Sequence, residues 1–258
     1  MPATLRANCI GSLAAQALSG GSSEIVGHVV NTFPNSFYVK TVHGELVFAT
    51  SRPLRSPITI NLDSSTSNLD QMIKPLEPVH VHEKEIRIGA DASIDLTGAL
   101  SYHGQSDSAS RLNPGFAEIG KTLRLVSFLI RILDTEQSVL DHHGLPYRGV
   151  VDFVSDGVIP ARHSSLEIRF RQAALKIVGL GSGFTPSGDD VLGGFLATYN
   201  SLAEAVQRAP VFLDFALLQG KTSWISAKLL DHMQRLILDD QVRLMIDRAA
   251  TADTDGLV

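Results

Sequence analysis

The chain has 258 residues, of which 44% are hydrophobic and 19% are charged, a composition typical of a compact globular protein. Its formal net charge is -5, and no run of Lys or Arg offers the basic surface that duplex nucleic acid requires. The single cysteine, Cys9, excludes an internal disulfide and a thiolate metal site, and fits a reducing cytoplasm. No apolar stretch is long enough to span a membrane, so we expect a cytoplasmic protein that binds neither nucleic acid nor membrane.

The N-terminal part has the pattern of β-strands after one short helix. The helix is expected over residues 10–18 and ends at Gly20. Strands are predicted where β-branched and aromatic residues are enriched, in five segments: IVGHVVNTF, SFYVKTV, ELVFAT, SPITINLD and VHVHEKEIRIGA. His43-Gly44 falls between the second and third segments and predicts a hairpin turn. An antiparallel sheet or a small barrel is therefore expected.

The hydrophobic period changes to that of helices after the Ser/Gly-rich segment 101–114. One helical face is predicted from Ile119, Leu123, Val126, Ile130 and Leu133, and a second from Leu166, Phe170, Ala173 or Ala174, and Ile177, with Gly179 as its C-cap. Three further helices are predicted in 191–206, 210–220 and 223–238. The fold class is therefore α+β, with a β-rich N-terminal part over 1–113 and a mainly helical domain over 114–258.

The stretch GLGSGFTPSGDDVLGGF, residues 179–195, is the strongest candidate for a binding site. Gly179, Gly181 and Gly183 alternate with other residues, a spacing that permits positive φ angles and turns backbone N–H groups toward an anion. A helix then starts either at Thr185-Pro186, as N-cap and first residue, or at Ser187, which forms a capping-box pattern with Asp190. The unpaired N–H groups of a helix start attract phosphate or carboxylate.

Two adjacent carboxylates, Asp189 and Asp190, modify that prediction. They would repel an anion unless a divalent cation such as Mg²⁺ bridges them to it, or unless they face an amide or ammonium donor. The pattern predicts a ligand with an anionic end and an N–H end, or a metal–phosphate pair. No Lys-Ser/Thr follows the glycines as in a Walker loop, and no strand precedes them as in a Rossmann fingerprint. The alternative is a helix corner in which glycines pack closely and aspartates only cap the helix dipole.

The stretch GLGSGFTPSGDDVLGGFLA resembles the Gly-Leu-Gly-x-Gly-Leu-Thr-Pro-Ser-Gly-Asp-Asp signature of the bacterial AllH-like family, long labelled a domain of unknown function. One member is a subunit of oxamate carbamoyltransferase. SRPLRSPITINLD and KTSWISAKLLDHM are also similar to that family, so the resemblance covers most of residues 24–235. Family members often carry a second Gly/Ser/Asp-rich segment near the C-terminus, which TADTDGLV lacks, so the resemblance implies either a shortened chain or an incomplete site.

The resemblance implies a subunit of a multi-subunit carbamoyltransferase of ureide breakdown, in which oxalurate or a related compound is phosphorolysed to carbamoyl phosphate. Carbamoyl phosphate combines a phosphate for the N–H groups with an NH₂ for a carboxylate. Asp189 and Asp190 become the candidate catalytic residues, with Asp190 as the first candidate to bind a donor or a metal. The ligand-binding candidates carried over from the family are Gly181, Gly183, Thr185, Ser187 and Gly188, with Lys221, Thr222, Ser223 and Ser226 approaching from a later helix.

Other chemistry-bearing residues are weaker candidates. Arg55 in a proline-containing loop is kept as a ligand contact, whereas its neighbour Arg52 is expected to be solvated. His80 and His82 share one strand face, but no third metal ligand is evident, and partly exposed strand histidines are the better interpretation.

Two helix-associated groups have structural interpretations as well. The cluster of His142, His143, Tyr147 and Arg148 is better explained as a solvated helix C-terminus than as an anion or proton-transfer site. Trp224, Ile225, Leu229 and Met233 have helical spacing and are expected in the core.

Two functions compete with the subunit hypothesis. The chain could be a stand-alone Mg-dependent enzyme that acts on an acyl phosphate or phosphate ester, with the two aspartates as metal ligands. It could also be a non-catalytic assembly subunit. No cofactor is certain from the sequence, and Mg²⁺ is the one ion that it suggests.

Overall fold

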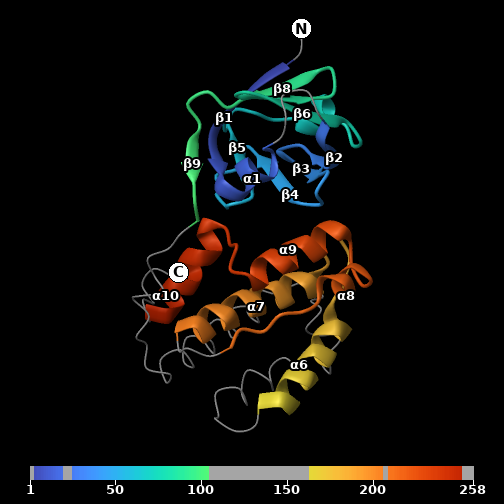
Figure 1. Cartoon of the computed structure of the whole chain (residues 1–258), viewed down its shortest axis with the longest axis vertical. Coiled ribbons are helices and arrows are strands. Elements are labelled where there is room, and N and C mark those ends of the chain that lie inside the picture. The colour runs from blue at the N-terminus through green and yellow to red at the C-terminus, as the bar shows by residue number, and fades with distance from the viewer. Residues whose placement is uncertain (1–2, 20–24, 105–162, 206–208, 252–258) are drawn as a thin grey trace. The chain divides into compact units, whose positions relative to one another are not determined.

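A computed structural model describes residues 3–19, 25–104, 163–205 and 209–251 (Figure 1). The chain forms two compact units. The barrel unit comprises Met1–Ser106 together with the returning segment Ile237–Arg243, and the helical unit comprises Asp107–Leu236 and Leu244–Val258. The division predicted at residues 113/114 lies outside the described residues, as do the predicted helix over 119–133 and the His142–Arg148 cluster.

The barrel unit is a closed ring of eight strands with a ninth strand attached. The strands are β1 (Ala3–Gly11), β2 (Ile25–Phe33), β3 (Ser36–Thr41), β4 (Leu46–Thr50), β5 (Thr59–Leu62), β6 (Pro78–His82), β7 (Glu85–Ile88), β8 (Ala92–Asp95) and β9 (Leu100–Tyr102). They pair in the order β5-β4-β3-β2-β6-β7-β8-β1-β9, and the additional pairing of β5 with β1 closes the ring. Closure leaves no free edge among the eight strands. Of the two expected architectures, the small barrel is the one observed.

Most strand pairs are antiparallel, and the predicted hairpin is confirmed: β3 pairs with β4 in the register Tyr38 to Phe48. Three pairs are parallel, however, namely β4–β5, β1–β8 and β1–β9. The short helix α1 (Ser12–Ala17) is confirmed, but Ile10 and Gly11 belong to β1, which the sequence analysis missed. The inward residues of β1 include the small Ala7 and Cys9, so its alternating pattern is weak in sequence.

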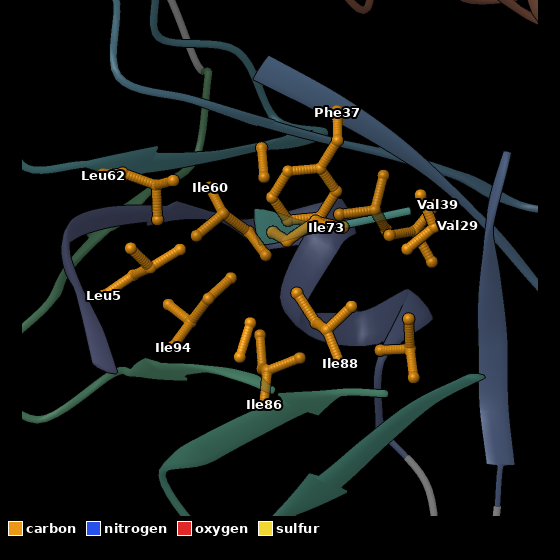
Figure 2. Close-up of a cluster of buried hydrophobic side chains, with 14 of the residues drawn as sticks. Leu5, Val29, Phe37, Val39, Ile60, Leu62, Ile73, Ile86, Ile88 and Ile94 are labelled. Carbon is orange, nitrogen blue, oxygen red and sulfur yellow. The ribbon is translucent and has the colours of Figure 1, made fainter. Parts of the chain in front are cut away.

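Apolar side chains fill the barrel (Figure 2). Four strands, β1, β5, β7 and β8, point Leu5, Ile60, Leu62, Ile86 and Ile94 inward. The short helix α2 (Leu69–Met72) adds Leu69 to this core. Ile73, the residue after the helix, is fully buried as well. A continuous apolar interior of this kind supplies most of the free energy that stabilises the unit.

The helical unit contains α6 (His163–Ile177), α7 (Ser187–Ala205), α8 (Phe215–Gln219) and α9 (Trp224–Gln234). Helices α7 and α9 lie side by side (Figure 1). Helix α6 packs on α7, where the rings of Phe170 and Phe195 have centroids 5.1 Å apart. These helices confirm the predicted mainly helical character, including Gly179 after the end of α6, where φ is +78°.

Helix boundaries differ from the predictions in two places. The helix predicted over 210–220 begins only at Phe215, because Val211 and Leu213 bond to two buried side chains, Asn200 and Gln234, instead of continuing a helix. The helix predicted over 223–238 ends at Gln234, and a further helix, α10 (Asp240–Thr251), was not predicted.

Candidate functional site

The glycine-rich stretch forms the loop between α6 and α7. Gly179, Gly181 and Gly183 have φ values of +78°, +102° and +114°, in the left-handed region that favours glycine. Gly181, Ser182 and Gly183 are exposed. Among the described residues, no hydrogen bond engages the backbone N–H groups of these three residues. The loop therefore presents several free N–H donors. Its backbone conformation is one that residues other than glycine do not readily adopt.

The start of α7 is more fully bonded than the sequence analysis expected. The helix begins at Ser187, and the carbonyl of Pro186 accepts hydrogen bonds from the N–H groups of Asp189 and Asp190, at 2.8 and 3.2 Å. The N–H of Gly188 donates to the carbonyl of Leu180 at 2.9 Å. Ser187 is thus a helical residue rather than the cap of a capping box. The free donors lie in the preceding loop, because the chain itself engages most of the first turn.

Asp189 ties this loop to α9. One carboxylate oxygen, Oδ1, accepts from the N–H of Gly179 at 2.8 Å. The other, Oδ2, accepts from the hydroxyls of Thr222 at 2.5 Å and of Ser226 at 2.6 Å. The side chain is 3% exposed. Hydrogen bonds to a charged group are each worth about 1.5–3 kcal/mol, and a buried carboxylate is tolerated only when such donors surround it.

Asp190 has the opposite environment, although it is the next residue. It is exposed, and partial desolvation raises the pKa of its carboxyl group above the usual value, with a smaller raising effect from the charge of Asp189. A hydrogen bond with the side chain of Thr185 opposes that rise in pKa. Consecutive helix residues point about 100° apart, so the two carboxylates do not converge on one ion. Within the described residues, no group of three or more His, Cys, Asp or Glu side chains could hold a metal.

The other candidates on the helical unit fall into two groups. Thr222 and Ser226 turn inward to Asp189, whereas Lys221 and Ser223 are exposed. The hydroxyl of Ser223 caps α9 by accepting from the N–H of Ser226 at 3.1 Å. The structure thus brings the segment that carries Thr222 and Ser226 against Asp189 at the start of α7.

Two glycines have packing roles that sequence reasoning missed. Gly188 is buried, and a Cβ there would overlap the carbonyl oxygen of Ile177. A Cβ at Gly179 would overlap the carbonyl oxygen of Lys221. Only glycine allows these close approaches, which hold α6, α7 and the start of α9 around the loop.

Arg55 lies in the barrel unit, in the loop 51–57. Buried polar side chains fix this loop: Asn61 Nδ2 donates to the carbonyl of Leu54 at 2.6 Å, and Thr59 donates to the carbonyl of Ser56 at 2.9 Å. Arg52 and Arg55 are exposed. The backbone N–H and carbonyl of Arg55 both bond Asp240, at 3.2 and 2.8 Å, so the returning segment is fastened to this loop.

The remaining candidates have structural surroundings. His80 pairs with Arg87 and His82 with Glu85 across β6 and β7, whereas Val79 and Ile88 face the interior. This register places His80 and His82 on the face of β6 opposite to Val79, away from the barrel interior. Of the residues expected in the core of α9, Ile225 is buried and the other three, Trp224, Leu229 and Met233, are half-buried. No described helix is both long and apolar enough to cross a membrane.

Comparison with protein families identifies two segments of the chain. Residues 4–101 match the AllH family N-terminal domain, and residues 177–256 match oxamate carbamoyltransferase subunit AllH. The chain belongs to the AllH family. The first AllH segment corresponds to the strands of the barrel unit, and the second begins at the last residue of α6, immediately before the glycine-rich loop. Searches of curated proteins and of solved structures gave no significant match.

Proposed function

We propose that this AllH-family chain is a subunit of a carbamoyltransferase complex of ureide catabolism, and that it binds carbamoyl phosphate or a related small carboxylate at the glycine-rich loop. The observation that carries the proposal is that the exposed residues Gly181, Ser182 and Gly183 have backbone N–H groups without a hydrogen bond among the described residues, in a loop anchored at Gly179 by Asp189. Fixed N–H groups of this kind bind anions without a large ordering cost.

Each end of the proposed ligand has a matching group. The phosphate would accept hydrogen bonds from the loop N–H groups, with the exposed Lys221 and Ser223 on the neighbouring segment as further donors. The carbamoyl NH₂ would donate to the exposed carboxylate of Asp190. In the carbamoyl-transfer reaction that we propose for the complex, these contacts at both ends would hold carbamoyl phosphate in one orientation.

Calorimetric titration of the purified chain with carbamoyl phosphate, with and without Mg²⁺, tests this proposal. We expect saturable binding, and we expect Asp190→Asn to weaken it by about tenfold, the cost of one charge-assisted hydrogen bond. Asp91→Asn removes one negative charge from an exposed residue of the barrel unit and should leave the affinity unchanged. No binding in either buffer, or equal affinities of the wild type and Asp190→Asn, would contradict the proposal.

A further inference from the structure

The contacts of Asp189 give it a different role from that of its neighbour. Its three hydrogen-bond donors come from both ends of the site: Gly179 precedes the loop, whereas Thr222 and Ser226 flank the start of α9. All three donors are neutral. The charge of the carboxylate therefore strengthens each of these bonds and is directed at the protein itself.

A direct ligand contact is hard to reconcile with this geometry. Both oxygens of Asp189 already accept hydrogen bonds, and the side chain is 3% exposed. Because Asp189 is buried, a ligand could reach the carboxylate only if a neighbouring group moved, and a displaced hydroxyl of Thr222 or Ser226 would be left without its acceptor. Asp190, by contrast, is exposed without any displacement.

We infer that Asp189 is a positioning residue that holds the glycine-rich loop against the start of α9, with Thr222 and Ser226 as its partners, and that it does not contact the ligand. The inference deepens the proposed function, on which its ligand readout rests. Without the carboxylate, Gly179 would lose its bond to α7 and the loop would no longer be fixed to α9. The loop N–H groups would then have to be ordered at the moment of binding, which weakens affinity.

The test uses two variants that remove one hydroxyl each, Thr222→Val and Ser226→Ala, with Thr222→Ser as the conservative rescue. We expect each deletion to weaken carbamoyl phosphate binding by about tenfold and Thr222→Ser to restore it. Thr198→Val is the matched control, because the Thr198 hydroxyl donates only to the carbonyl of Gly194 within α7, at 2.8 Å. It should leave the affinity unchanged. Unchanged affinity in both folded deletion variants would overturn the inference.

Asp189→Asn separates positioning from direct contact. Asparagine keeps an acceptor for the N–H of Gly179 and an amide that can donate to the hydroxyls of Thr222 and Ser226. A positioning residue should therefore tolerate this change with a modest loss of affinity. Complete loss of binding in Asp189→Asn, with the loop still ordered, would show that the charge of Asp189 contacts the ligand.

A second readout needs no ligand. The N–H groups of Gly179 and Gly188 bond Asp189 Oδ1 and the carbonyl of Leu180, so their hydrogen exchange reports whether the loop is held. We expect faster exchange of both amides in Thr222→Val and Ser226→Ala, and wild-type exchange in Thr198→Val. If the wild type fails to bind carbamoyl phosphate, the proposed function fails alone, and this readout still decides the inference: unchanged exchange would overturn it.

Discussion

The interior of the barrel and the glycine-rich site of the helical unit are stabilised by different kinds of interaction. The barrel interior is a continuous set of apolar side chains, and the buried polar side chains of the barrel unit, such as Asn61, act on the loop 51–57. In the helical unit, three buried polar side chains act at defined points: Asp189 holds the glycine-rich loop, while Asn200 and Gln234 hold the segment 210–214. An apolar interior tolerates hydrophobic substitutions that conserve volume, whereas a buried polar group tolerates few substitutions of any kind, because its partners lose their hydrogen bonds.

The barrel interior should give the largest loss of stability. Phe37 is 1% exposed, and we expect Phe37→Ala to cost about 3–5 kcal/mol, since it removes a large side chain and leaves a cavity. Hydrogen exchange of the β3 amides in urea measures the effect within the barrel. Val42→Ala, at a residue that is 60% exposed, should change stability by less than about 0.5 kcal/mol. A comparable loss at both positions would mean that the interior does not dominate the barrel.

Substitution of Asn200 tests how much a buried polar side chain stabilises the helical unit. Its amide donates to the carbonyls of Val211 and Gln234, and its oxygen accepts from the N–H of Val211 at 2.8 Å. We expect Asn200→Ala to cost roughly 3 kcal/mol, because buried backbone groups lose their partners. The only tryptophan, Trp224, lies in the helical unit, so its fluorescence during urea unfolding follows this loss. Thr198→Val, two residues earlier on α7, should cost much less, and equal costs would show that the surroundings of Asn200 are only loosely packed.

Asp190 should give the smallest effect, with a characteristic pH dependence. The pKa of Asp190 is higher in the folded state than in the unfolded chain. As pH rises, the Asp190 carboxyl therefore ionises first in the unfolded chain, and this ionisation lowers the stability of the folded state above the ordinary aspartate pKa. Asp190→Asn should therefore raise the melting temperature slightly at neutral pH, and this gain should vanish below the ordinary aspartate pKa. Melting curves across that range measure it. A gain that persists at low pH would have a cause other than ionisation.

Elements with a local sequence pattern were predicted, whereas elements that depend on residues distant in sequence were missed. Strands β2 to β7 were predicted from their β-branched and aromatic residues, with β6 and β7 in one segment, and helices α6, α7 and α9 from their apolar patterns and the Gly and Pro residues that bound them. β1 was missed because its inward Ala7 and Cys9 are small, and its partners β5 and β8 are distant in sequence. The extended segment before Phe215 was missed because it depends on Asn200 and Gln234, which no local pattern connects to it.

The candidate site was only partly predictable. The glycines, Thr222 and Ser226 were selected from the sequence, and the structure places them together. The different environments of Asp189 and Asp190 were not foreseen, because helix geometry directs one carboxylate inward and the next outward. Two adjacent acidic residues look equivalent in sequence until the start of the helix is fixed.

The attachment of Asp240 to the loop of Arg55 has a consequence for the order of synthesis. The last strand of the barrel unit ends at Tyr102, but its returning segment begins only at Ile237. During translation the backbone of Arg55 can therefore bond Asp240 only after the ribosome has made all the residues between Tyr102 and the returning segment. The final native contacts of the first unit are then among the last to be made.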